Sequence, residues 1–173
     1  MVDAGIERRD AFHYCALPAL LRGHDIPHQI RECYRALDVH LSELGLEERG
    51  PSIIRYRRSS EEGPLEVEIG WIMPEPVAVA PPFVSDRLPQ GTYVVGWHNG
   101  AYSRIAESTR ELISWGDEQG VTWAVEPGPD GDLWASWFEL YLTEPSFGPE
   151  GPVGSVEVCV GIRDEGPAEL REG

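Results

Sequence analysis

The segment HQIRECYRALDVHLSELG, residues 28–45, decides the fold because its pattern returns later in the chain. Its apolar residues recur at helical spacing, which predicts an α-helix that ends at Gly45. Shifted by 75 positions, residues 30–45 fall on residues 105–120 of a second predicted helix, SRIAESTRELISWGDEQG, with six identities in sixteen positions. The repeated helix indicates an internal duplication.

Predicted strands flank both helices, at 12–22, 51–58 and 64–73 around the first and at 91–98, 133–142 and 155–162 around the second. The pattern predicts an α+β fold of two tandem strand-helix-strand-strand modules with pseudo-twofold symmetry. We expect one domain over 10–163, with module one at 10–73, a proline-rich linker at 74–83, module two at 84–163, and an acidic tail at 164–173. One module alone would bury too little surface to fold stably by itself. The seam between two modules is a natural place for a pocket.

The composition restricts the class of partner. The chain has 173 residues, 14 Lys+Arg against 30 Asp+Glu, and a formal net charge of −16. Such a surface disfavours nucleic acids and anionic membranes and attracts organic cations. With no signal peptide and no apolar run long enough to span a bilayer, we expect a soluble, cytoplasmic protein. The three cysteines are widely spaced and the common nucleotide, zinc and hydrolase motifs are missing, so we expect no metal and no cofactor.

The stretch WASWFELYLTEP, residues 134–145, contains the candidate functional group. Strand alternation puts Trp137, Glu139 and Tyr141 on one face and Phe138 and Leu140 on the other. We expect the Phe138 face to pack on the helix, which leaves the aromatic and carboxylate face to line a partly dry site. A carboxylate among rings can hold a cation, or it can work as a general acid or base.

The stretch GWHNGAY, residues 96–102, is predicted to end a strand and lead through a tight turn into the second helix. Trp97 and Tyr102 are expected to lean toward the same cavity as Glu139. His98 has no nucleophile at motif spacing, which favours a histidine that orders the turn.

The order of these signals resembles the GyrI-like, or AraC-type effector-binding, domains. The resemblance rests on LPQGTYVVGWHNGAY at 88–102, then a helix, then WFELYLTEP at 137–145 and SVEVCVGI at 155–162, with EVEIGWIMP at 66–74 as the matching strand of module one. The family's G-x-Y-x-x-x-x-H-x-G-x-Y pattern corresponds to Gly91, Tyr93, His98, Gly100 and Tyr102. The match covers roughly residues 10–163.

The resemblance implies a ligand cavity at the junction of the modules, where a buried glutamate contacts hydrophobic, often cationic, drugs. That glutamate corresponds to Glu139, and the stacking rings are then expected to be Trp97, Tyr102, Trp137 and Tyr141, with Trp71 reaching across the seam. Some members are fused to DNA-binding helix-turn-helix regions and act as drug-sensing transcription regulators, whereas we expect this chain to be a stand-alone version.

Among the activities that the resemblance implies, multidrug binding is favoured. Hydrolysis of cyclopropane-bearing genotoxins is the alternative, with Glu139 and Tyr141, or Tyr102, as the catalytic groups. Inhibition of DNA gyrase ranks third because the acidic residues are dispersed. The oligomeric state stays open.

Overall fold

The computed structural model describes residues 2–163. Its first half contains β1 (Asp3–Arg9), β2 (Phe12–Leu21), α1 (Ile26–Glu43), β3 (Ser52–Ser59) and β4 (Leu65–Met73). Its second half contains β5 (Val84–Leu88), β6 (Gly91–Ala101), the 3-10 helix η1 (Tyr102–Arg104), α2 (Ile105–Glu118), β7 (Val125–Glu126), β8 (Asp132–Tyr141), β9 (Ser146–Gly148) and β10 (Gly151–Gly161). Within residues 2–163, no helix is both long and apolar enough to cross a membrane.

The predicted α+β class and the repeated modules are confirmed. The strands form one antiparallel sheet in the order β1-β6-β10-β8-β3-β4-β2-β5. The repeat β2-α1-β3-β4 contributes β3-β4-β2, and the repeat β6-α2-β8-β10 contributes β6-β10-β8, so the two halves mirror one another about the central β3–β8 pair. That arrangement gives the sheet a pseudo-twofold axis between β3 and β8.

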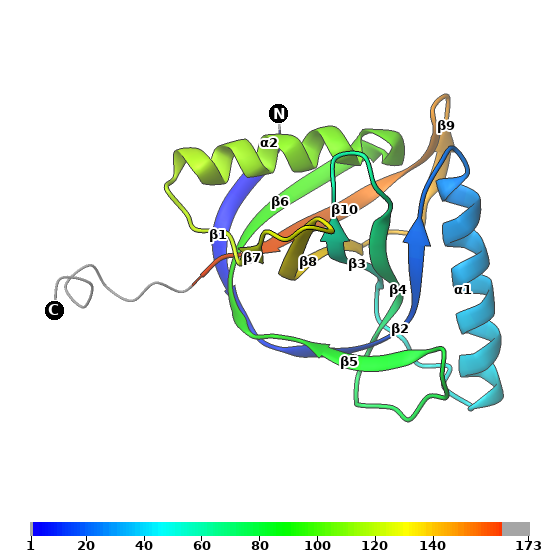
Figure 1. Ribbon diagram of the computed structural model, residues 1–173. Helices are drawn as coiled ribbons and strands as arrows, with labels where there is room; N and C mark the ends of the chain where they lie inside the picture. Colours follow the sequence, from blue (N-terminus) through cyan, green and yellow to red (C-terminus); the bar gives the residue numbers. More distant parts are fainter. Residues whose placement is uncertain (1, 164–173) are drawn as a thin grey trace, which may run out of the picture.

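The sheet closes on itself through an exchange of strands that the sequence analysis did not predict. Strand β1 precedes the first repeat but pairs with β6 of the second, from Asp3 opposite Trp97 to Arg9 opposite Gly91. Strand β5 precedes the second repeat but pairs with β2 of the first, from Phe12 opposite Leu88 to Ala16 opposite Val84, which continues the register of the β1–β6 pair. Residues 3–16 and 84–97 therefore run antiparallel as one long two-stranded ribbon, and Figure 1 shows the ring of strands that results.

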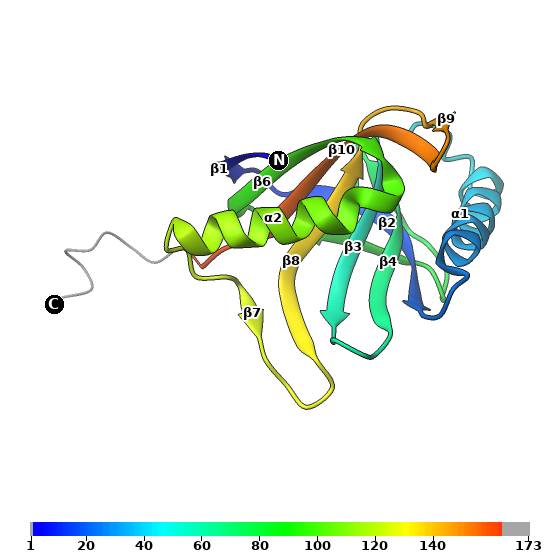
Figure 2. The same cartoon turned by 90° about the horizontal axis from the view of Figure 1, so that it is seen from above.

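Both helices lie outside this ring, α1 beside β2 and β4 and α2 along β6 (Figure 2). The helical repeat seen in the sequence is confirmed in their packing. Leu37 and Leu112, which are 75 positions apart, are both fully buried. Gly45 and Gly120 follow the two helix ends with φ of +74° and +77°, a conformation that favours glycine at this position.

The two faces of the sheet are the reverse of what the sequence analysis expected. Phe138 and Leu140 do not pack on a helix: they lie inside the ring, in an apolar core with Tyr14, Ile53 and Tyr93. The outer face, which carries Trp137, Glu139 and Tyr141, is the one that the helices flank. The expectation was wrong because the closed sheet covers its own inner face, and no local pattern in the sequence reveals that closure.

Candidate functional site

Glu139 lies at the centre of the sheet, where the two repeats meet. On β8 it is opposite Val158 of β10 on one side and Ile54 of β3 on the other. Only 3% of the residue is exposed. A carboxylate is rarely buried this deeply without partners, so its surroundings bear directly on function.

Two tyrosines, one from each repeat, hold the same oxygen of this carboxylate. The hydroxyl of Tyr56 on β3 donates to Oε1 at 2.9 Å, and the hydroxyl of Tyr141 on β8 donates to it at 2.8 Å. Within residues 2–163, the other oxygen of Glu139, Oε2, accepts no hydrogen bond. One carboxylate oxygen is therefore fixed and the other remains available to a ligand.

Burial controls the protonation of this group. Desolvation raises the pKa of the Glu139 carboxyl, while the hydrogen bonds from Tyr141 and Tyr56 act in the opposite direction by stabilising the ionised form. Burial also raises the pKa of both tyrosines well above the ordinary value, and the nearby Glu139 charge adds to that effect. The phenols therefore stay protonated as donors, and the carboxyl is the group that titrates first.

Aromatic rings surround the carboxylate along β8. Trp137 stacks on Tyr56 with ring centroids 4.2 Å apart, and Trp134 meets Trp137 edge-on at 5.2 Å. Tyr102, at the start of the second helical segment, meets Tyr141 edge-on at 5.3 Å. Among the described residues, the indole nitrogen of Trp137 and the hydroxyl of Tyr102 are buried without a hydrogen-bond partner.

Two further tyrosines at this site were missed by the sequence analysis. Tyr34 projects from α1, donates its hydroxyl to the Ile53 carbonyl at 3.3 Å, and has a pKa raised first by burial and further by the Glu139 charge. Tyr56 lies in the predicted strand 51–58, and the sequence analysis gave it no role. Strand alternation puts Tyr56 on the same face as Ile54, but only the pairing of β3 with β8 brings that face beside Glu139.

The two tryptophans that were predicted at the site from outside β8 lie on opposite faces of the sheet. Trp71 lies on the outer face, because it pairs with Ser52, whose other partner is Tyr141; its ring meets Tyr34 edge-on at 5.6 Å. Trp97 is not brought to this site. It points into the ring of strands, where its Nε1 donates to Glu157 Oε2 at 3.2 Å. Alternation along β6 puts Gly96, under Leu112 of α2, outside and therefore puts Trp97 inside.

His98 orders the turn, as the sequence analysis favoured. Its Nε2 lies 2.8 Å from the Ala101 carbonyl oxygen and its Nδ1 2.7 Å from the Ser108 hydroxyl. Because a carbonyl only accepts, Nε2 is the donor in the bond to Ala101. The imidazole thus fixes the segment that leads into Tyr102.

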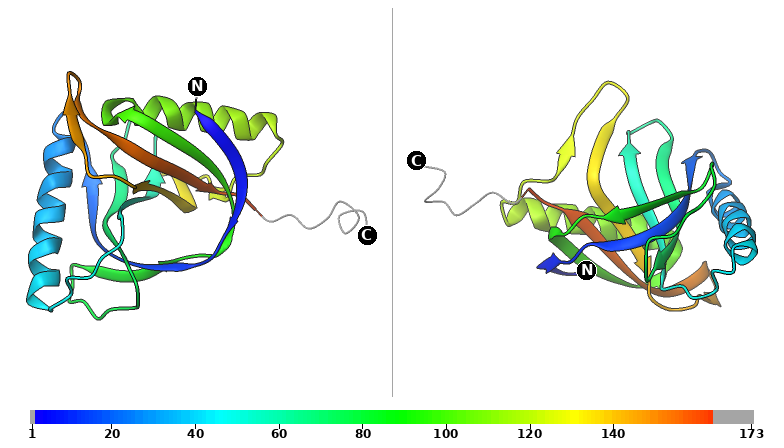
Figure 3. Two further views of the ribbon diagram at one scale, coloured as in Figure 1. Left: turned by 180° about the vertical axis from the view of Figure 1, so that it is seen from behind. Right: turned by 90° about the horizontal axis from the view of Figure 1, so that it is seen from below.

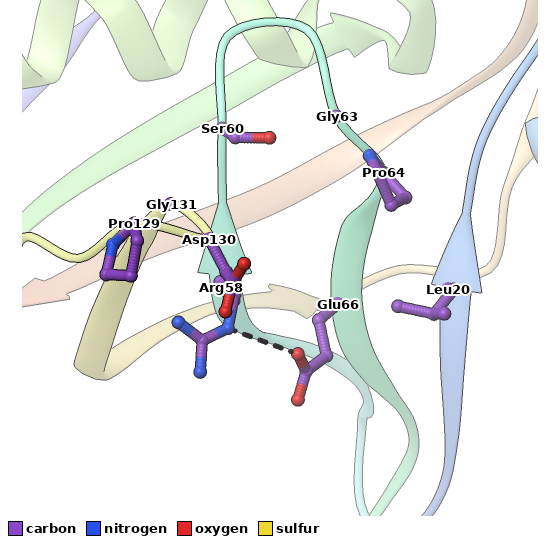
Figure 4. Close-up of a pocket in the computed structure, with 9 residues that line it drawn as sticks. All are labelled: Leu20, Arg58, Ser60, Gly63, Pro64, Glu66, Pro129, Asp130 and Gly131. Atoms are coloured by element: carbon purple, nitrogen blue, oxygen red, sulfur yellow. Dashed lines mark ion pairs between the residues drawn. The ribbon is translucent and has the colours of Figure 1, made fainter.

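Two hollows in the surface lie away from the carboxylate. One, of about 590 Å³, lies between the hairpin loops of the two repeats, where Arg58 pairs with Glu66 at 3.4 Å beside Asp130 (Figure 4). The other, of about 490 Å³, lies at the end of α1. Neither is lined by Glu139, which is itself buried. Within residues 2–163 no cluster of three or more His, Cys, Asp or Glu side chains suits a metal ion.

A family model for the GyrI-like small molecule binding domain matches residues 21–130, more than half of the chain. The chain belongs to the GyrI-like family. The matched range ends before β8, so Glu139 lies outside it. No curated protein matches this GyrI-like domain.

Solved structures share the fold of this GyrI-like domain. The C-terminal domain of EcmrR matches with a TM-score of 0.71 at 10% identity, covering 94% of this chain and 98% of that domain. The domain spans 57% of the EcmrR chain found in a DNA complex, with 94% of this chain covered, a TM-score of 0.69 and 10% identity.

Two further proteins match over nearly their whole length. SAV2435 bound to tetraphenylphosphonium matches with a TM-score of 0.57 at 13% identity, covering 93% of this chain and 94% of that one. A protein from Listeria innocua described as a hydrolase matches with a TM-score of 0.58 at 14% identity, covering 92% and 91%. At these identities the likeness concerns the fold.

Proposed function

We propose that this GyrI-like domain binds bulky aromatic cations at the seam between its repeats, with Glu139 as the counter-ion. The observation that carries the proposal is the buried carboxylate itself: Tyr56 and Tyr141 fix one oxygen and leave the other unbonded among aromatic rings. A cation at that oxygen would also lie against ring faces, which attract positive charge. The cationic ligand in the SAV2435 structure supports this choice of ligand class.

The proposed ligand-binding groups are those gathered around the carboxylate. Glu139 supplies the charge, and the rings of Tyr34, Tyr56, Tyr102, Trp137 and Tyr141 supply the contact surface. In the closed state the rings shield Glu139 from water, so binding requires some of them to rotate outward, as partly buried aromatic side chains can. The net charge of −16 favours the approach of a cation over that of an anion.

Ligand binding should depend on pH because only the ionised carboxylate attracts a cation. The charge of tetraphenylphosphonium does not change with pH, so any pH dependence reports on the protein. Since burial raises the pKa of Glu139, affinity should fall on acidification with a midpoint above the ordinary glutamate value of about 4.3. Isothermal titration calorimetry between pH 4.5 and pH 8 measures it. The uncharged triphenylphosphine oxide is the control and should bind weakly at every pH; an affinity for tetraphenylphosphonium that is constant over this range would contradict the proposal.

A second candidate function, hydrolysis of a strained ring, is favoured by the hydrogen bond between Tyr141 and Glu139. Glu139 would take a proton from water, the water oxygen would bond to a cyclopropane carbon, and the released carbon–carbon bonding pair would take up a proton supplied by Tyr141 or Tyr102. The proton on Glu139 would then pass to the tyrosine oxygen and restore both groups. Incubation with a cyclopropane-bearing alkylating agent, followed by mass spectrometry, tests it. We expect a product heavier by one water with the wild type and not with Glu139→Gln; an equal yield from both proteins would remove Glu139 from the chemistry.

A further inference from the structure

One aromatic ring on the outer face already holds a cation, and that cation belongs to the protein. The guanidinium of Arg49 lies over the ring of Trp71, with Cζ 5.6 Å from the centroid. Arg49 comes from the segment 44–51, which joins α1 to β3 and contains no helix or strand. The contact therefore joins a connecting segment to the sheet.

A carboxylate completes the arrangement. Asp38 of α1 accepts hydrogen bonds on the same oxygen, Oδ1, from Arg49 Nη1 at 2.7 Å and from Trp71 Nε1 at 2.8 Å. Trp71 and Asp38 together offer a ring face beside a carboxylate, which is the combination that suits an organic cation. In this structure Arg49 fills that place.

A hollow of about 490 Å³, in the size range of small-molecule sites, is lined by residues 44–48, which directly precede Arg49, and by residues 73–78 at and after the end of β4. Leu46 and Met73 line it and pack in the same apolar cluster as Trp71. Its exposed rim carries Glu47, Glu48 and Glu75, and no basic side chain is among the residues that line it. Glu47 lies 4.0 Å from the Arg49 guanidinium. The hollow combines an apolar floor with negative charge, so its chemistry also suits a lipophilic cation.

We propose that Trp71, Asp38 and the adjoining hollow form a second site for aromatic organic cations, and that Arg49 closes it. Opening requires only the Arg49 side chain to leave, because the backbone beside it is tied to β4: the Gly50 amide donates to the Ile72 carbonyl, and the Ile72 amide donates to the Pro51 carbonyl. The site meets the one at Glu139 at the Tyr34 ring, which contacts Trp71 edge-on, but its carboxylate is Asp38 and not Glu139. It does not depend on the function proposed for Glu139.

The test replaces Arg49 by methionine, which keeps the length of the side chain and removes the charge. The background is Glu139→Gln, so that the first site contributes little. Tetraphenylphosphonium is titrated by calorimetry at neutral pH. We expect Arg49→Met to increase the affinity roughly threefold to thirtyfold, the range for a desolvated cation–π contact. The matched control is Arg35→Met on the exposed face of α1, where the side chain is 74% exposed and pairs with Glu32; it makes the same change in net charge and should alter affinity less than about twofold.

Two further variants assign the gain to this site. Adding Trp71→Leu or Asp38→Asn to Arg49→Met should abolish the gain, which makes the comparison a double-mutant cycle. Arg49→Gln serves as a second replacement if the methionine variant unfolds, as judged by circular dichroism. Equal affinities for the Arg49 and Arg35 variants would overturn the proposal. Equal affinities for wild type and Glu139→Gln would instead overturn the function proposed for Glu139, and the Arg49 series would still test this site.

Discussion

Replacing Glu139 by glutamine should lower the affinity for tetraphenylphosphonium tenfold to a hundredfold. Glutamine keeps the size of the side chain, and its carbonyl oxygen can still accept from Tyr56 and Tyr141. Only the charge is lost, and one contact between an ion and a desolvated partner is worth about 1.5–3 kcal/mol. The control is Glu144→Gln, an exposed residue close to the end of β8, which makes the same change in net charge and should leave the affinity within about twofold.

The same substitution should stabilise the unliganded protein. The pKa of Glu139 is raised in the folded state, so its contribution to stability is fully present below the unfolded pKa and is lost as the pH rises through the folded pKa. At pH 8 the wild type holds a buried charge that glutamine does not have, and the variant should unfold with a free energy higher by about 1 kcal/mol or more. At pH 4, where the carboxyl is protonated, the two proteins should be nearly equal. Urea denaturation at both pH values measures this.

A variant that loses both affinity and stability would show that Glu139 is structural. The proposed function requires the opposite signs, with ligand affinity decreasing while stability at high pH increases. This combination is typical of groups retained for binding at the expense of folding, and it does not depend on knowing the natural ligand.

The largest effect on folding should come from Gly70→Ala. Gly70 lies on β4 opposite Ala16 of β2, and a methyl group there would come within 1.7 Å of the Cys15 carbonyl oxygen and 2.7 Å of the Ala16 Cα. These are backbone atoms, so relief would require β2 and β4 to move apart. We expect a loss of at least about 4 kcal/mol, which is exceptional for one methyl group.

The control for Gly70 is a strand glycine with space around it. Gly5 of β1 has no atom within 4 Å of the position that a methyl group would take. Gly5→Ala should therefore change the urea midpoint little, whereas Gly70→Ala should leave most of the chain unfolded or sharply lower its midpoint. Similar midpoints for the two variants would mean that the sheet adjusts at Gly70 far more easily than its geometry implies.

Local patterns in the sequence predicted the elements better than their assembly. The two helices, with their equivalent Leu37 and Leu112 and the glycines that follow them, were visible from spacing alone. Alternation correctly grouped Trp137, Glu139 and Tyr141 on one face. The face toward the helices was assigned incorrectly because the closure of the sheet was not predicted. Strands β1 and β5, which close it, are short and rich in polar residues, so their sequences do not indicate buried strands.

The candidate site shows the same division. Glu139, Tyr141, Trp137 and Tyr102 lie together, as the sequence analysis expected. Trp97 was included because it is near Tyr102 in the chain, although its position in the alternation of β6 directs it to the other face. Tyr34 and Tyr56 were missed because each comes from the first repeat, and only the pairing of β3 with β8 brings them to Glu139.

The exchange of β1 and β5 means that the two repeats are interlocked. Each carries at its own beginning a strand that is built into the other (Figure 3). The proline-rich segment 74–83 connects the repeats along the chain, but cutting it would not free them, since three separate rows of backbone hydrogen bonds still cross between them, at β1–β6, β2–β5 and β3–β8. A ligand at the seam would therefore lie between halves that backbone pairing holds together on three lines.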